Sequence, residues 1–475
     1  MKRGKRDRRR CALSAQCGAI VAGFWKIRLV GLFATALVLL TLSSAAFATP
    51  FGSGATSWAA RFQSASQNTE TSPAEQPQPR AYTLPPDKEA RAIAYAHARH
   101  QLYFLDFLFT TVGLALLVQL AVAPRLRDWA EHISRHRFLR AVIFAGPFFI
   151  LLGLLSLPAA AAGHWLERHY GQSVQGWGSW VWDALKGGAI ALLLAIFLVW
   201  LFYGLVRRSP RRWWFYAWLG SLPILIFLIF VEPVVLEPLF FRFTPLAARD
   251  PQLAAELERV VQHGGQEIPE TRMYLMNASS KLNALNAYVT GIGASERVVV
   301  WDTTIAQMTT PEILFVFGHE MGHYVLHHIR NGILFTAGVL LIFLFGGFHA
   351  LRWALGRFGA AWKIRSADDW ASLPVLIFAI LIFNFIFTPI DNAYSRHLEH
   401  QADQYGLEVV HGSVPNSSQV AAQSFQILGE IDLAEPSPST AVKIWFYDHP
   451  PLDERILFAQ TYDPWDKGES PEFVK

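Results

Sequence analysis

The chain has 475 residues, of which 52% are hydrophobic and 14% aromatic, and the apolar residues gather in long blocks. This composition excludes an ordinary soluble enzyme and indicates an integral membrane protein, with the lipid bilayer as a partner. The net charge of +4 comes mostly from a basic leader and from loops between the apolar blocks. We therefore interpret the charge as a sign of membrane topology and expect no nucleic-acid partner.

The N-terminal residues 1–48 combine a leader rich in Lys and Arg with an apolar block from Ile27 to Ala48. The block ends in Ala46-Phe47-Ala48, an acceptable signal-peptidase site. The segment is therefore either a cleaved signal peptide or a first transmembrane helix. Both cysteines, Cys11 and Cys17, lie here, so the rest of the chain can form no disulfide and no thiolate metal site.

Residues 49–88 are rich in Ser, Gln, Pro and Ala, which is typical of a flexible linker. Six apolar blocks follow, each near the length of about 20 residues that crosses a bilayer. They are Leu102 to Pro124, Ala141 to Ala162, Gly187 to Val206, Trp213 to Val235, Gly332 to Leu351 and Leu373 to Ile390. We predict a mainly α-helical polytopic membrane protein with six spans, or seven if the leader block also crosses the membrane.

The spans divide the chain beyond the linker into a membrane domain and a soluble domain in two parts. Residues 89–235 form an N-terminal transmembrane domain of four spans. Residues 236–330 and 391–475 are polar, and a hairpin of two spans, 331–390, separates them. Because both polar parts emerge on the same side of the membrane, we expect them to form one domain.

Basic residues indicate the orientation, because they gather in three of the loops between spans. They are Arg125, Arg127, Arg135, Arg137 and Arg140; Arg207, Arg208, Arg211 and Arg212; and Arg352, Arg357, Lys363 and Arg365. By the positive-inside rule these loops face the cytoplasm. The soluble domain then lies on the non-cytoplasmic side.

The first polar part has the pattern of an α+β domain. Apolar spacing predicts a helix from Asp250 to Gly264, and runs of β-branched and aromatic residues predict strands at Met273 to Met276 and Arg297 to Trp301. A further helix is expected from Pro311 to Arg330, capped by Thr309 or Thr310.

That last helix contains the pentapeptide His319-Glu320-Met321-Gly322-His323. Two imidazoles four residues apart share one face of a helix and can hold one zinc ion, while the intervening carboxylate acts on the bound water. The metzincin pattern is excluded, because Leu326 and Ile329 occupy its Gly and His positions. His327 lies a further turn away, about 6 Å along the axis, too far to join the site easily.

A third ligand can come from the segment after the last span. Glu399 and Asp403 are four residues apart and so share a helical face. Glu399 can bind the metal while Asp403 accepts the free N–H of a ligand histidine. On spacing alone, an amphipathic helix with solvated acids is an equally good interpretation.

Together these motifs resemble the integral-membrane CAAX prenyl protease type I family, the gluzincin zinc metalloendopeptidases. The resemblance also covers Ser395-Arg396, Phe243 to Leu246 and His449-Pro450-Pro451-x-x-Glu454-Arg455. It implies a split zincin domain with one Zn²⁺ per chain, bound by His319, His323 and Glu399. It further implies that Glu320 is the general base and that Asp403 supports the ligands.

The same resemblance suggests how a peptide substrate binds. His449 matches a family histidine that can donate to the oxyanion, although a lone His before two prolines is more often a loop residue. Asn286 and Ala287 line the cleft in the family. We expect Val298 and Val300 to lie on an edge strand that a peptide joins, with an ordinary core strand as the alternative.

The sequence thus predicts a membrane-integrated zinc endopeptidase that acts on peptides or proteins, in CAAX-type processing or in membrane-protein quality control. The rivals are an inactive membrane scaffold and a transporter-like protein with a protease-like domain. We expect the inner membrane of a bacterium. Eukaryotic family members have a cytosolic active site, whereas the arginines here favour the opposite side, and we follow the arginines. The sequence indicates no oligomeric state.

Overall fold

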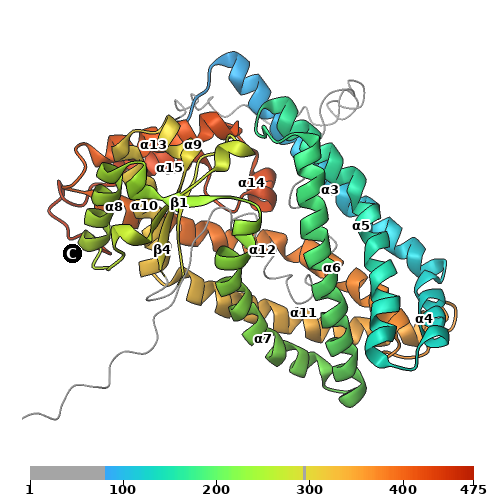
Figure 1. Ribbon diagram of the computed structural model, residues 1–475. Helices are drawn as coiled ribbons and strands as arrows, with labels where there is room; N and C mark the ends of the chain where they lie inside the picture. Colours follow the sequence, from blue (N-terminus) through green and yellow to red (C-terminus); the bar gives the residue numbers. More distant parts are fainter. Residues whose placement is uncertain (1–80, 292–295, 475) are drawn as a thin grey trace, which may run out of the picture.

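The computed structural model describes residues 81–291 and 296–474. Among these residues, six helices are long and apolar enough to cross a membrane, and each overlaps one of the predicted spans. The six helices begin and end as follows: α3 (Pro86–Gln119), α5 (Arg137–Tyr170), α6 (Trp177–Arg208), α7 (Trp213–Val231), α11 (His328–Phe358) and α12 (Leu373–Val410) (Figure 1). The prediction of six spans is confirmed. The apolar block in the leader lies outside the described residues.

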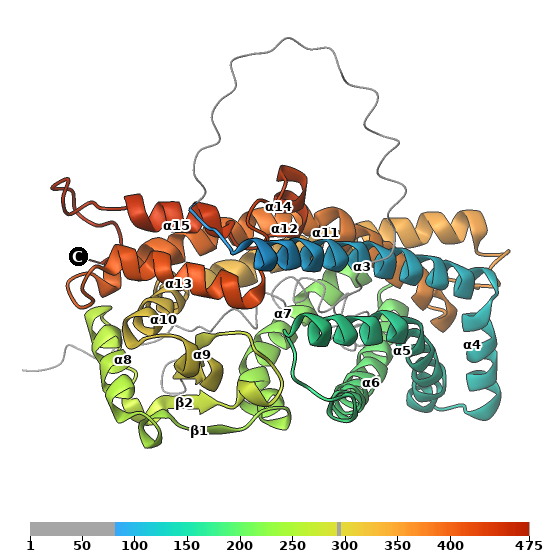
Figure 2. The ribbon, with the colours of Figure 1, turned by 90° about the horizontal axis from the view of Figure 1, so that it is seen from above.

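The loops that were predicted to share one side of the membrane meet at one end of the bundle. A short helix, α4 (Val122–Ile133), connects α3 to α5 there (Figure 2). Its Arg127 is buried and lies 2.5 Å from the carboxylate of Asp369, in the loop between α11 and α12. Arg365 of the same loop lies 2.9 Å from Glu131 of α4. These ion pairs fasten the N-terminal bundle to the hairpin.

The soluble domain contains one sheet in the described part of the chain. Its strands are β1 (Phe243–Pro245), β2 (Met273–Met276), β3 (Ala287–Thr290) and β4 (Arg297–Trp301), in the order β1-β2-β4-β3. β2 and β4 are parallel, whereas the other two pairs are antiparallel. Both predicted strands are present.

The predicted edge position of the strand from Arg297 to Trp301 is wrong. β4 pairs with β2 on one side and with β3 on the other, so it lies inside the sheet. Val298 and Val300 are fully buried there and cannot pair with a substrate. A run of β-branched residues that is buried on both faces is typical of a central strand. The two edge strands of this sheet are β1 and β3.

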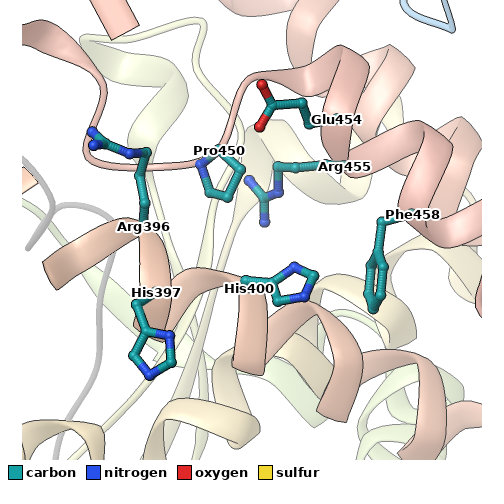
Figure 3. Close-up of a pocket in the computed structure, with 7 residues that line it drawn as sticks. All are labelled: Arg396, His397, His400, Pro450, Glu454, Arg455 and Phe458. Carbon is teal, nitrogen blue, oxygen red and sulfur yellow. The ribbon is translucent and has the colours of Figure 1, made fainter. Parts of the chain in front are cut away.

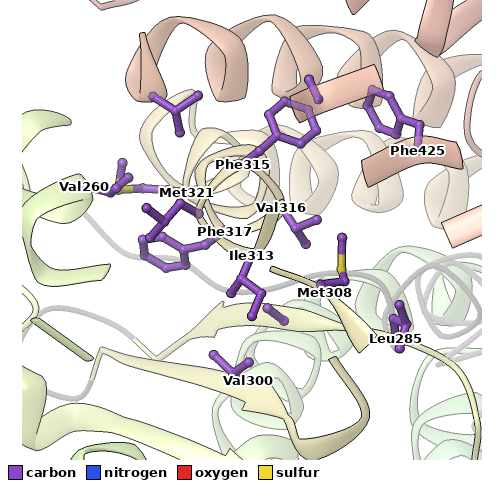
Figure 4. Packing of buried hydrophobic residues seen from close by; sticks show 14 of the residues in the cluster. Val260, Leu285, Val300, Met308, Ile313, Phe315, Val316, Phe317, Met321 and Phe425 are labelled. Atoms are coloured by element: carbon purple, nitrogen blue, oxygen red, sulfur yellow. The ribbon is translucent and has the colours of Figure 1, made fainter. Parts of the chain in front are cut away.

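Helices cover the sheet and complete a common hydrophobic core. They are α8 (Pro251–His263), α9 (Asp302–Gln307), α10 (Thr310–Val325), α13 (Ser417–Asp432), α14 (Thr440–Phe446) and α15 (Leu452–Thr461). Single turns of 3₁₀ or π helix occur at Glu232–Leu236, Glu237–Leu239, Leu246–Ala248, Glu270–Arg272, Ala278–Ser280 and Trp370–Ser372. Phe315 of α10 packs edge-on against Phe425 of α13, with Val300 of the sheet in the same cluster (Figure 4). The segments before and after the hairpin therefore share one core.

The helix that carries the pentapeptide is shorter than predicted. It begins as expected, since the N–H of Thr309 donates to the Glu312 carboxylate at 2.7 Å in a capping box. It ends at Val325, and His327 then adopts the left-handed conformation with φ 58° before α11 begins. The predicted continuous helix to Arg330 is therefore wrong. This turn separates the soluble helix from the membrane helix.

A buried carboxylate joins the sheet to the membrane domain. Asp183 of α6 lies 2.5 Å from Lys281, in the loop before β3, and 2.8 Å from Lys186. The side-chain amide of Gln175 also donates to it at 2.7 Å. The carboxylate is shared by two cations. It therefore holds the loop before β3 in contact with α6.

Candidate metal centre

The pentapeptide places three polar side chains in the hydrophobic interior. His319, Glu320 and His323 are all buried, and each offers a donor atom within 4.8 Å of the others. The Nε2 atoms of the two histidines lie 3.2 Å apart. Helical spacing of four residues alone accounts for this geometry, because it stacks both rings on one face of α10.

Glu399 of α12 adds a third donor between the two rings. Its Oε2 lies 3.2 Å from Nε2 of His319 and 3.4 Å from Nε2 of His323. A tetrahedral zinc ion with ligands at about 2.0–2.2 Å holds its donor atoms roughly 3.3–3.5 Å apart. The three atoms therefore fit the donor set of one such ion.

Small residues allow the two donor helices to approach this closely. A Cβ atom on Gly406 of α12 would lie 2.9 Å from the backbone nitrogen of His319. A Cβ atom on Gly322 of α10 would lie 3.0 Å from the Cβ of Tyr405. Larger residues would push α10 and α12 apart and separate Glu399 from the histidines.

Asp403 and Arg455 fix the orientation of His319. Oδ1 of Asp403 lies 2.8 Å from Nδ1 of His319, so the other ring nitrogen, Nε2, points its lone pair toward Glu399. Arg455 of α15 donates two hydrogen bonds to the same carboxylate, at 2.8 and 2.5 Å. Burial lowers the pKa of His319, but the two neighbouring carboxylates outweigh burial and raise the pKa to about 9. Binding of a metal at this ring therefore displaces a proton.

His328 contacts His323 on the ring nitrogen Nδ1, as Asp403 contacts His319. Its Nδ1 lies 3.0 Å from Nδ1 of His323, and its ring is buried at the start of α11. The left-handed turn at His327 brings it there, while His327 itself is exposed. Sequence reasoning considered His327 and missed the role of His328. The pair of consecutive histidines after the pentapeptide was the available signal.

His449 lies at the same centre, in the loop between α14 and α15. Its Nε2 is 3.1 Å from Oε2 of Glu399, and its Nδ1 is 2.9 Å from the carboxylate of Asp448. Burial lowers the pKa of His449, but the charges of Glu399 and Asp448 raise the pKa to about 10. The two carboxylates thus favour the protonated ring, which can donate a hydrogen bond.

Asn286 and Ala287 lie at the edge of the sheet beside α10. β3 contacts α10, and in the described part of the chain no strand pairs with its outer edge. The backbone of Asn286 is held by Thr304 and Trp301. Its side chain is buried, and neither amide atom has a hydrogen-bond partner among the described residues. A buried amide of this kind is available to a ligand.

A cavity of about 360 Å³ lies beside this centre, between α12 and α15 (Figure 3). It is lined by Arg396, His397, His400, Pro450, Glu454, Arg455 and Phe458. None of the three donor residues is among them. The cavity therefore borders the supporting Arg455 and not the donor atoms.

Family models match two consecutive parts of the chain. Residues 247–463 match the model of peptidase family M48. Residues 67–242 match a model described as "CAAX prenyl protease N-terminal, five membrane helices". The gap between the two matches, 243–246, contains β1, where the chain leaves the membrane domain.

Several known proteins are similar over most of their length. "Uncharacterized metalloprotease YhfN" of Bacillus subtilis is 34% identical over 381 residues, which are 79% of this chain and 86% of that protein. "CAAX prenyl protease 1" of Saccharomyces cerevisiae is 26% identical over 334 residues, 67% of this chain and 71% of that protein. The crystal structure of S. mikatae Ste24p superposes with a TM-score of 0.70 at 18% identity, over 92% of this chain and 99% of that one. That structure therefore has the same fold.

Proposed function

Since this chain belongs to peptidase family M48, as a membrane-integrated metallopeptidase similar to the CAAX prenyl proteases, we propose that it is a zinc-dependent endopeptidase. The observation that carries the proposal is the triangle of donor atoms from His319, His323 and Glu399, with edges of 3.2, 3.2 and 3.4 Å. Two neutral imidazoles and one carboxylate are a common donor set of catalytic zinc.

In this proposal Glu320 is the general base. It is fully buried beside the two histidines, within reach of the same centre. When bound, zinc supplies a Lewis acid that makes water acidic enough to attack near neutral pH. Glu320 accepts the proton from the attacking water and returns it to the leaving amine. Asp403 and Arg455 hold His319 in place during both steps.

His449 is proposed to stabilise the transition state. Its Nδ1 bonds to Asp448, which leaves the Nε2–H directed at the centre, 3.1 Å from Glu399. A cationic donor at this distance can stabilise the negative charge that develops on the substrate carbonyl oxygen.

The substrate is proposed to join the outer edge of β3 as an extended peptide. Backbone pairing of this kind recognises the shape of a peptide more than its side chains, which favours broad specificity. The carboxamide of Asn286 can then bond to the peptide backbone. Val298 and Val300 support β3 from inside the sheet.

Replacement of Asn286 by alanine is expected to lower kcat/KM about tenfold, mainly by raising KM, because one buried hydrogen bond to the substrate is lost. Stability should change little, since the amide has no partner among the described residues. The control is Asn283→Ala, which removes a side-chain bond to the Gly171 carbonyl and should lower stability while KM stays the same. Steady-state kinetics and thermal unfolding measure both effects. An unchanged KM in Asn286→Ala would contradict this role.

Replacement of His328 by leucine is expected to weaken zinc binding about 10–100-fold, the usual effect of removing a group that supports a ligand. The Nδ1 of His323 then loses its neighbour at 3.0 Å. The control is His327→Asn, at the adjacent, exposed position. Asparagine tolerates the left-handed backbone conformation of residue 327, so this change should not disturb the turn. Competition with a fluorescent zinc chelator measures both affinities. Equal affinities for His328→Leu and His327→Asn would refute the assignment.

We propose that the protein resides in a bacterial inner membrane with the centre on the non-cytoplasmic side. The positive-inside rule, applied to the three basic loops, supports this orientation. Recognition of the peptide backbone at β3 is compatible with both CAAX-type processing and membrane-protein quality control. Cleavage of matched prenylated and unprenylated peptides distinguishes them. A reporter fused after Lys475 that is active only in the cytoplasm would reverse the proposed orientation.

A further inference from the structure

The short helix α14 leads directly into the loop that carries His449. The helix ends at Phe446, and His449 follows three residues later. Two aromatic residues of α14 pack on the membrane spans. The ring of Trp445 lies 4.8 Å from that of Phe385 in α12, and the ring of Phe446 lies 5.5 Å from that of Phe104 in α3. Apolar contacts attract without a fixed direction, so directional bonds are needed to fix the position of α14 along α12.

Two polar side chains of α12 supply these directional bonds. Asn392 is buried, and its Nδ2 donates to the carbonyl of Trp445 at 2.6 Å. The Nη1 of Arg396 donates to the carbonyl of Tyr447 at 2.5 Å and to the carbonyl of Lys443 at 3.1 Å. The last carbonyl groups of a helix lack N–H partners within the helix. The two side chains therefore satisfy the end of α14 and hold it on α12.

The same stripe of α12 supplies the proposed third zinc donor. Its members are Asn392, Arg396, Glu399 and Asp403, whose spacing of four, three and four residues keeps them on one helical face. The first two hold the end of α14, and the last two belong to the centre. The Nε2 of His449 lies 3.1 Å from Oε2 of Glu399. One helix therefore holds both Glu399 and the segment that brings His449 to it.

Arg396 holds the chain nearest to His449. One of its two acceptors, the carbonyl of Tyr447, belongs to the residue two positions before His449. Figure 3 shows Arg396 on α12, with its side chain directed toward the loop that continues to Pro450. Loss of this side chain would free the start of the loop without removing any of the proposed donor atoms.

We propose that Arg396, assisted by Asn392, is a positioning residue that keeps the Nε2–H of His449 beside Glu399. The inference rests on the role of His449 in cleavage proposed above. When the loop shifts, this N–H no longer meets the carbonyl oxygen of the substrate, and a small displacement of a catalytic group lowers the rate by a large factor. Zinc binding is kept, because the three proposed donors do not move with the loop.

The test is Arg396→Met in the full-length, detergent-purified protein, a change that keeps the length of the side chain and removes its donors. Per bound zinc, kcat should fall about 10–100-fold, whereas KM and zinc affinity should change less than about twofold. A double-mutant cycle with His449→Ala shows whether the two residues act together. In the His449→Ala background, Arg396→Met should lower kcat by no more than about twofold, because the positioned group is already absent. An equal loss in both backgrounds would overturn the proposal.

A second measurement reports the position of His449 without any cleavage. Diethyl pyrocarbonate modifies accessible imidazole nitrogens, and mass spectrometry of the resulting peptides gives the rate at His449. Its Nε2 and Nδ1 lie 3.1 and 2.9 Å from carboxylate oxygens of Glu399 and Asp448, so the wild-type rate should be low. Arg396→Met should raise it severalfold, and an unchanged rate would overturn the proposal. If wild type cleaves no peptide, or if His449→Ala cleaves normally, the proposed function or the role of His449 fails, and the modification rate alone decides the positioning.

The matched control is His397→Gln, at the next residue of α12, which is exposed and lines the same cavity as Arg396. Cleavage and the modification of His449 should both stay at wild-type levels. A loss of cleavage in this control would overturn the proposal, because any change on this part of α12 would then slow the enzyme. Arg396 is half-buried, so its variant should fold. Asn392→Ala removes the bond to the Trp445 carbonyl and gives a second, independent result, in which kcat should fall and modification of His449 should accelerate.

Discussion

Replacement of Glu320 by glutamine is expected to reduce peptide cleavage about 10²–10⁴-fold, because an amide cannot accept the proton of the attacking water. Zinc should stay bound at one ion per chain, since the proposed donors are His319, His323 and Glu399. Glutamine keeps the volume of a fully buried side chain, so the fold should be retained. Cleavage of a fluorogenic peptide by detergent-purified protein, with zinc measured by mass spectrometry on the same sample, gives both results.

This experiment also separates the proposed enzyme from its rivals. An inactive scaffold or a transporter-like protein predicts no cleavage by wild type under any zinc loading. Cleavage by Glu320→Gln at the wild-type rate would show that another group is the base. Loss of zinc from that variant would instead identify Glu320 as a ligand. Its carboxylate lies within 4.8 Å of both histidine donor atoms, so the experiment tests this alternative directly.

Replacement of Glu399 by glutamine is expected to abolish both zinc binding and cleavage. The carboxylate is the only anionic member of the proposed donor set, and its Oε2 lies 3.2 and 3.4 Å from the two histidine nitrogens. The loss of zinc affinity should exceed the roughly 10–100-fold effect of changing a supporting group. Zinc titration of the metal-free protein measures this directly.

The matched control is Glu408→Gln, on the same helix and equally buried. The Glu408 carboxylate accepts backbone N–H groups of Glu472, Phe473 and Val474, and so holds the C-terminal segment against α12. Its replacement should lower the unfolding temperature without changing zinc affinity. If Glu399→Gln and Glu408→Gln both retain zinc, the third donor is not Glu399.

The local features of this protein could be predicted well from its sequence. Six apolar blocks specify six spans because burial in lipid demands continuous hydrophobic helices. The pentapeptide puts His319 and His323 on one face through helix geometry alone. The spacing of Glu399 and Asp403 likewise places both carboxylates on one face of α12.

The features that depend on distant pairing could not be predicted in the same way. The strand from Arg297 to Trp301 was expected at an edge of the sheet. Its composition suits an edge strand and a central strand equally, so the sequence could not decide between the two positions. Its actual position depends on the pairing of β2 with β4, which no local pattern indicates. Arg455 meets Asp403 only through the packing of α15 on α12, and His328 meets His323 only through a left-handed turn.

The hairpin of α11 and α12 has a consequence for synthesis of the protein. His319 and His323 precede both crossings, whereas Glu399 and Asp403 follow them, so a growing chain lacks part of the proposed donor set until both helices have been made. The proposed zinc-dependent cleavage of peptides would therefore begin only after the hairpin has been synthesised. A truncated product that ends within the hairpin lacks Glu399, so we expect it to cleave no peptide.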